Sequence, residues 1–207
     1  MLLMRKLPVM MLLASPLAAA EFDYYLLTLS WAPDFCVQAK GSKDPAECGP
    51  GKKLGFVVHG LWPQRDNGRG PENCRPASPV AANLVRTMLN YIPTKGLIQH
   101  EWQTHGTCSG LSAVDYFAAV RLARDSVKIP PEFQAPAQRL TLTPAAIEAA
   151  FQAANPQFPK TAFRTSCTGG TLQEVRVCLD KEEITPRDCG ASAGECKSAT
   201  MSVLPVK

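Results

Sequence analysis

Histidine is scarce in this chain: the 207 residues include only three, and all three fall within two short windows. Long apolar runs are lacking too, because no stretch beyond the N-terminal segment approaches the roughly 20 apolar residues that a membrane-spanning helix needs. Neither sign of charge is in large excess. The net charge of +4 does not by itself indicate a nucleic-acid partner, since binding to a polyanion depends on local clusters of charge.

The N-terminus has the pattern of an export signal. Arg5 and Lys6 precede an apolar run from Leu7 to Leu17, and residues 18–20 are the small side chains that a signal peptidase reads. We expect residues 1–20 to be a signal peptide cleaved after Ala20, and residues 21–207 to form one domain. The mature protein should then be exported, periplasmic or secreted, and no longer attached to a membrane.

Cysteine pairs with metal-binding spacing are absent, since neither Cys-x-x-Cys nor Cys-x-x-x-x-Cys occurs. The cysteines are even in number behind an export signal, which predicts four disulfides formed in an oxidising compartment. Eight cysteines permit 105 connectivities, so their spacing alone does not choose among them. They are Cys36, Cys48, Cys74, Cys108, Cys167, Cys178, Cys189 and Cys196.

Periodicity and capping residues predict a mixture of strands and helices. Apolar or alternating runs predict strands, and Ser or Thr followed by proline or an acidic residue predicts helix starts. No repeat or linker interrupts the chain, so we expect one α+β domain. The expected strands are 22–30, 54–58 and 171–179, and the expected helices are one from Ser78-Pro79 to Ile92, one opening the second histidine window and ending at Gly106, one from Ser112 to near Val127, and one over 145–154.

The first histidine window is 55–64, and the second is 100–108. We expect His59 to lie at the end of a strand, followed by Trp62 and Gln64 as the wall of a site; a buried core histidine is the simpler reading. On a helix, Glu101 and His105 would share one face. Two histidines can hold one proton and lack another at the same pH, so one can donate while the other accepts.

Several hydrolase classes do not fit these windows. The zinc-protease pattern places its histidines at i and i+4, whereas His100 and His105 are separated by five residues, about 140° apart on a helix. A Gly-x-Ser-x-Gly motif is absent, and we expect no free cysteine. Acid–base catalysis without a covalent intermediate remains, as in cleavage of a phosphodiester by its neighbouring 2′-hydroxyl. A metal-dependent phosphoesterase stays an alternative, which would require bound zinc.

The windows Phe56–Pro63 and His100–Cys108 resemble the two active-site segments of the ribonuclease T2 family. The strand that starts at Asp23, followed by Trp31 and Cys36, matches as well, so the resemblance covers most of the mature chain. It implies an α+β fold with a central antiparallel sheet packed by several helices. It also implies a monomeric endoribonuclease of low base specificity that cleaves single-stranded RNA through a 2′,3′-cyclic phosphate, with no metal or other cofactor.

The resemblance also implies roles for individual residues. His59 would be the general acid for the leaving 5′-oxygen, and His105 the base for the 2′-hydroxyl. His100 would hold the phosphate, while Glu101 would position it or stabilise the phosphorane and, through its charge, favour the protonated form of His105. Trp62 would either stack on a base or ribose or support His59 by packing.

The second segment departs from the family pattern at one position. Thr104 stands where the family often has a lysine, whose ammonium would stabilise the transition state. We count Thr104, with Gln64, among the expected substrate-binding residues, and expect weaker catalysis or a substitute arginine from the loop Arg65–Arg75. An exported RNA-binding protein of the same fold with weak or lost catalysis is the alternative function.

The resemblance finally suggests how the cysteines pair. It implies two successive bridges in the first half of the chain and a nested pair in the second. The implied pairs are Cys36–Cys48, Cys74–Cys108, Cys167–Cys196 and Cys178–Cys189.

Overall fold

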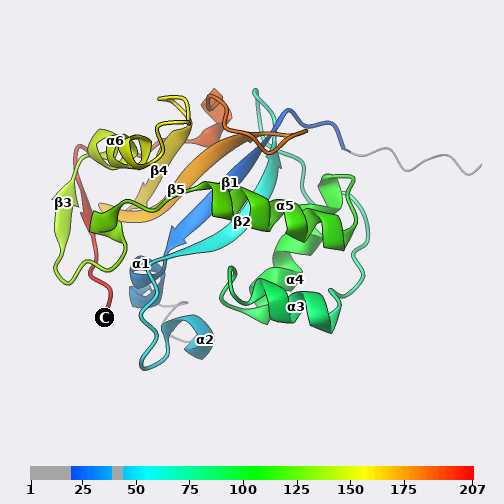
Figure 1. The fold of residues 1–207 in the computed structure, drawn as a ribbon, viewed down its shortest axis with the longest axis horizontal. Coiled ribbons are helices and arrows are strands. Elements are labelled where there is room, and N and C mark those ends of the chain that lie inside the picture. The colour runs from blue at the N-terminus through cyan, green and yellow to red at the C-terminus, as the bar shows by residue number, and fades with distance from the viewer. Residues whose placement is uncertain (1–19, 39–43) are drawn as a thin grey trace, which may run out of the picture.

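One central sheet organises the molecule (Figure 1). The computed structural model describes residues 20–38 and 44–207. In this part of the chain the strand order is β2-β1-β5-β6-β3, and β4 also pairs with β5. All pairings are antiparallel except the short parallel contact of β5 with β6. The strands are β1 Tyr24–Trp31, β2 Phe56–Gln64, β3 Leu140–Leu142, β4 Phe163–Thr168, β5 Thr171–Asp180 and β6 Met201–Val203.

The helices gather at different parts of the sheet (Figure 1). Helices α3, α4 and α5 gather beside β2, α6 lies with β3 and β4 toward the opposite edge of the sheet, and α1 packs with α2. The architecture confirms the expected α+β class with a central sheet. The helices are α1 Ala32–Val37, α2 Pro45–Cys48, α3 Ala82–Met88, α4 Lys95–Thr104, α5 Ala113–Ser126 and α6 Pro144–Ala154, with 3-10 turns at Gly106–Cys108, Pro131–Phe133 and Ala191–Ala193.

The two faces of the sheet differ in what they bury. Along β1, Leu27 and Leu29 alternate into the main hydrophobic core, which α5 and α6 complete. Tyr24 and Leu26 point to the opposite face and form a small second cluster with Cys178. The second face therefore has little apolar cover, and its remaining side chains are free to form a polar site.

A β-bulge at His59 gives β2 its unusual alternation. Thr28 pairs with Gly60 and Leu29 with Val58, so His59 has no partner on β1. A bulge shifts the alternation by one residue. As a result Val58 and Leu61 both enter the main core, although their separation would place them on opposite faces of a regular strand.

The expected strands were partly wrong in extent. Strand β2 does not end at residue 58: it runs from Phe56 through Gly60 and Pro63 to Gln64. Strands β3, β4 and β6 were not expected at all. Strand β5 matches the expected run, ending one residue later at Asp180.

The helix starts were correctly predicted where a side-chain cap forms. The hydroxyl of Ser112 accepts from the backbone N–H of Asp115 at the start of α5. Thr143 caps α6 in the same way. The start at Ser78-Pro79 was wrong: α3 begins at Ala82 and has no side-chain cap.

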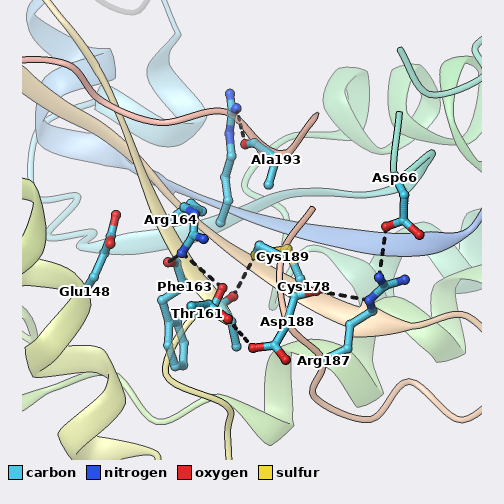
Figure 2. Close-up of a disulfide and its surroundings, with 12 residues drawn as sticks. Asp66, Glu148, Thr161, Phe163, Arg164, Cys178, Arg187, Asp188, Cys189 and Ala193 are labelled. Atoms are coloured by element: carbon cyan, nitrogen blue, oxygen red, sulfur yellow. Dashed lines mark hydrogen bonds and ion pairs between the residues drawn. A yellow bond between two sulfur atoms is a disulfide. The ribbon is translucent and has the colours of Figure 1, made fainter. Parts of the chain in front are cut away.

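All four disulfides have the pairing that the resemblance implied, and the described residues hold no free cysteine. Figure 2 shows Cys178–Cys189, which ties the segment after β5 back onto that strand. In the same segment Arg187 points to Asp66 and forms an ion pair of 2.9 Å with it. The C-terminal region therefore anchors the loop that follows β2.

The expected signal peptide lies almost wholly outside the described residues. Among the helices of the described chain, none combines the length and apolar character that crossing a membrane requires.

Candidate active site

Strand β2 presents His59 and Trp62 on the same side because of the bulge. Their ring centroids are 5.1 Å apart in an edge-to-face arrangement. Nδ1 of His59 lies 3.0 Å from Oε1 of Glu174 on β5 and 3.4 Å from the hydroxyl of Ser30 on β1. His59 is therefore not the simple core histidine of the alternative reading: its side chain is 33% exposed and surrounded by polar groups.

Helix α4 brings Glu101 to the same place. The Glu101 side chain is 1% exposed, and Oε2 accepts a 2.8 Å hydrogen bond from the indole Nε1 of Trp62. The other oxygen, Oε1, lies 3.7 Å from Nε2 of His59. A Cβ added at Gly60 would overlap this carboxylate, so a glycine beside His59 is what lets α4 approach the strand.

His105 lies just beyond the end of α4. Its backbone N–H donates to the carbonyl of Glu101, and its ring stacks on Trp62 with centroids 5.0 Å apart and planes inclined by 28°. The expected helix end at Gly106 is nearly right, but the reason is different. A Cβ at Gly106 would press into the ring of Trp102, so this glycine permits close packing.

The two histidines on either side of Trp62 have opposite pKa shifts. Burial lowers the pKa of His59, but its hydrogen bond to Glu174 and the charges of Glu101 and Glu174 outweigh burial, so the net shift is upward. Burial, aided by the charges of His100 and His59, lowers the pKa of His105 to about 4. At neutral pH the site thus favours a charged His59 beside an uncharged His105.

Glu101 does not act on His105 as expected. Its carboxylate contacts His59, and the pKa of His105 is lowered rather than raised. Burial raises the pKa of Glu101 itself to about 7, against the opposing effects of the His59 charge and the Trp62 hydrogen bond. The prediction that Glu101 favours the protonated form of His105 was wrong, because an i, i+4 spacing fixes the helix face but not the direction of the side chains.

Two further charged residues enter the site from β5. Glu174 bridges His59 and Arg176: its Oε2 accepts hydrogen bonds from Arg176 at 3.0 and 2.8 Å. Arg176 also lies over Trp62, 5.9 Å from the ring centroid. Both residues lie within the expected strand 171–179, but the sequence did not show that this strand lies next to β1, two strands from β2.

Two hollows flank this centre. One of about 600 Å³ is lined by Trp62, Gln64, His105 and the loop after β2. Another of about 300 Å³ lies on the far side of His59 and is also lined by His100, from α4. Thr104 lies close to His100, with Oγ1 3.5 Å from Nδ1. All seven residues expected at the site are thus brought to one region.

The arginines of the loop after β2 differ in position. Arg65 donates to the carbonyl of Glu21, and Arg75 donates to the carbonyl of Leu111. Arg69 lines the larger hollow together with His105. Among these arginines, Arg69 is therefore the one placed to meet a bound anion. Within residues 20–38 and 44–207, no group of three or more potential metal ligands is assembled.

The chain is similar in sequence to bacterial proteins named as ribonucleases. A ribonuclease of Aeromonas hydrophila is 32% identical over 170 residues, covering 79% of this chain and 74% of that protein. A probable ribonuclease of Haemophilus influenzae is 33% identical over 177 residues, covering 80% of this chain; the match spans 60% of the length of the Haemophilus protein.

Solved structures show the same fold. An RNase-related protein from Calystegia sepium superposes with a TM-score of 0.71 at 20% identity, over 90% of this chain and 99% of that chain. The model of the ribonuclease T2 family matches residues 22–189. Since this match includes both histidine windows and well over half of the sequence, the protein belongs to the ribonuclease T2 family.

Proposed function

We propose that this protein cleaves single-stranded RNA by transphosphorylation, with His105 as the general base and His59 as the general acid. Membership of the ribonuclease T2 family identifies the enzyme class, an endoribonuclease. The observation that carries the assignment of roles is the opposite pKa shift of two imidazoles packed against one indole ring. Such a pair holds a donor and an acceptor ready at the same pH.

The proposed reaction proceeds in two proton-balanced steps, of which the first is the transphosphorylation. Neutral His105 takes the proton of the 2′-hydroxyl, and the 2′-oxygen attacks the adjacent phosphorus. His59 gives its Nε2 proton to the departing 5′-oxygen, so the products are a 2′,3′-cyclic phosphate and a free 5′-hydroxyl. In the second step the roles reverse: His59 takes a proton from water, the water oxygen attacks the cyclic phosphate, and His105 returns a proton to the 2′-oxygen.

Glu101 and His100 would act on the phosphate itself. The buried Oε1 of Glu101 lacks a hydrogen-bond partner and lies 3.7 Å from Nε2 of His59. With a pKa of about 7, its protonated form could donate a hydrogen bond to a phosphorane oxygen. His100 is exposed at the mouth of the smaller hollow, where it can hold the phosphate.

For Trp62 the geometry favours the packing role over the base-stacking role. His105 stacks on the ring, Arg176 lies near it, and the indole N–H is committed to Glu101. A base would have to displace one of these contacts. We infer that Trp62 sets the positions of His105 and Glu101, while its edge and Gln64 form a wall of the larger hollow.

The hollows on either side of His59 would receive the nucleosides that flank the scissile phosphate. The larger hollow is lined by the amides of Gln64 and Asn67, which both donate and accept hydrogen bonds, by the acceptor Asp66 and by the donor Arg69. Such mixed walls support low base specificity. We also propose that the chain acts as a monomer without a metal or other cofactor, and that residues 1–20 direct its export, which the four disulfides support.

A second candidate function follows from Thr104. If no cation replaces the lysine that the family often has there, the protein would bind RNA and cleave it weakly or not at all. Arg69 in the larger hollow favours the enzymatic reading, because it offers a guanidinium beside His105.

Digestion of RNA and DNA in excess chelator tests the proposal. We expect the mature protein to degrade RNA and leave DNA intact, and His59→Ala and His105→Ala each to abolish cleavage. Activity on DNA, or loss of activity with chelator, would overturn the proposed function. RNA binding that survives His59→Ala, with no cleavage by either protein, would establish the alternative.

A further inference from the structure

We propose that Glu174 is a positioning residue for catalysis: clamped by Arg176, it holds Nδ1 of His59 so that Nε2 is the nitrogen presented to the leaving oxygen. The proposal rests on the proposed function, in which His59 is the general acid. It adds a carboxylate and a guanidinium from β5 to a site built otherwise from β2 and α4.

Strand register places the pair where it can act. Glu174 is opposite Ser30 on β1, and Arg176 is opposite Thr28, so both point to the face on which the bulge presents His59. The Glu174 side chain is 12% exposed and divides its two oxygens between two partners. Oε1 faces the imidazole at 3.0 Å, and Oε2 faces the guanidinium at 2.8 Å.

The contact fixes which nitrogen carries the proton. An ionised carboxylate only accepts hydrogen bonds, so Nδ1 of His59 must be the donor to Glu174. Nε2 then carries the proton that is transferred, and it regains its lone pair when that proton leaves. A hydrogen-bonded partner on one ring nitrogen orients the ring and selects the tautomer in this way.

Arg176 keeps the carboxylate in place and charged. Besides its two bonds to Glu174, it donates to the carbonyl of Ala193 at 2.9 Å, so the guanidinium is itself fixed. Burial raises the pKa of Glu174, but the hydrogen bond to His59 and the charge of Arg176 outweigh it, so the net shift is downward. Glu174 therefore remains an anion through the pH range in which His59 must act.

The two residues act on His59 with opposite sign. The Glu174 anion raises the pKa of His59, whereas the Arg176 cation lowers it. Other ionisable groups also face this imidazole and stay unchanged in the experiment below. They are Glu101, His100 and His105 from α4 and its C-terminal end, and Glu47 with Asp44 from α2 and its cap.

Titration of His59 by NMR in the mature protein tests the proposal directly. With three histidines in the chain, the His59 resonance can be assigned by comparison with His59→Ala. Glu174→Gln keeps a hydrogen-bond acceptor but removes the charge, and we expect the pKa of His59 to fall by about one unit or more. Arg176→Gln should raise the pKa of His59, because it removes the cation that lowers it. Glu183→Gln, an exposed carboxylate beyond the other end of β5, removes the same charge and should leave it unchanged.

The pH profile of RNA cleavage gives the second readout. In Glu174→Gln we expect the alkaline limb to shift to lower pH with the His59 pKa, kcat to fall and KM to stay the same. Glu174→Asp retains the charge, so it should keep the alkaline limb near that of the native protein even where shortening the side chain lowers kcat. A residue that only stabilised the fold would lower the amount of active enzyme without moving a limb.

The outcomes separate this proposal from the function on which it rests. An unchanged His59 pKa in folded Glu174→Gln would overturn the positioning role, whatever the activity. If Glu174→Gln does not fold, a His59 pKa that is the same in Arg176→Gln as in the native protein would overturn it. If the native protein cleaves no RNA, the proposed function fails, while the NMR titration still decides whether Glu174 controls the protonation of His59.

Discussion

The indole N–H of Trp62 donates to a carboxylate oxygen of Glu101 across 2.8 Å, joining the edge strand of the sheet to helix α4. This bond connects two sequence windows that are separated by more than 30 residues. Because the ring of Trp62 also stacks on His105, one side chain contacts both the buried carboxyl group of Glu101 and the imidazole of His105.

Replacing Trp62 by phenylalanine keeps an aromatic ring against His105 but removes the donor to Glu101. We expect kcat on RNA to fall by on the order of 10-fold or more, since a hydrogen bond to a buried charged acceptor contributes about 1.5–3 kcal/mol. Steady-state kinetics measures the loss. The control is Trp102→Phe, because Trp102 is a buried tryptophan on α4, the helix of Glu101, and packs on Tyr116. An equal loss of kcat in both variants would show that Trp62 has only a packing role.

Gly60→Ala should disable the site through steric overlap. The new Cβ would meet the Glu101 carboxylate and lie 2.5 Å from the indole nitrogen of Trp62. We expect a loss of about 1–3 kcal/mol in the free energy of unfolding, as for other overpacked positions, together with a large fall in turnover. Denaturant unfolding and RNA cleavage measure the two effects. Turnover at the native level would contradict the close approach of α4 to β2.

The rate of cleavage should show a bell-shaped dependence on pH. His105 must be neutral to act as a base, and its pKa is about 4, so the rate should rise with pH through that value. His59 must be charged to act as an acid, and its pKa is raised above 6.5, so the rate should fall only at higher pH. A kcat/KM profile that climbs steadily into the alkaline range would be incompatible with a charged His59.

Thr104→Lys should raise turnover by restoring a cation beside His100. A single donor at a transition-state anion is commonly associated with a change on the order of 10²-fold in kcat. Gln103→Lys adds the same charge at an exposed position one residue away on α4, so it separates a local effect from a general gain in RNA affinity. If Thr104→Lys left kcat unchanged, the missing ammonium would be unimportant or already replaced, with Arg69 as the candidate.

Parts of the fold could be predicted from local signals. The hydroxyls of Ser112 and Thr143 identified helix starts because a cap is a short-range interaction. The alternation of Val175 and Val177 with polar residues identified β5, because this pattern too can be read within a few neighbouring residues. Strand β4 could not be found in this way, because its sequence is mostly polar and its existence depends on pairing with β5.

The sequence predicted which residues of the two histidine windows come together, but not their contacts, nor that Glu174 and Arg176 join them. The clustering of histidines in two windows indicated which side chains meet. The bulge at His59 and the neighbouring position of Glu174 depend on how β1 pairs with β2 and β5. The sequence of one strand does not indicate which distant strand it pairs with.

The central claim is that His59 and His105 transfer protons within one transphosphorylation step, and the termini of the RNA fragments test it most directly. Mature protein and a short single-stranded RNA would be incubated in excess chelator, and early products analysed by mass spectrometry. The account predicts fragments that end in 2′,3′-cyclic phosphate, accompanied by fragments with a free 5′-hydroxyl. Fragments that carry a 5′-phosphate and a free 3′-hydroxyl would contradict it.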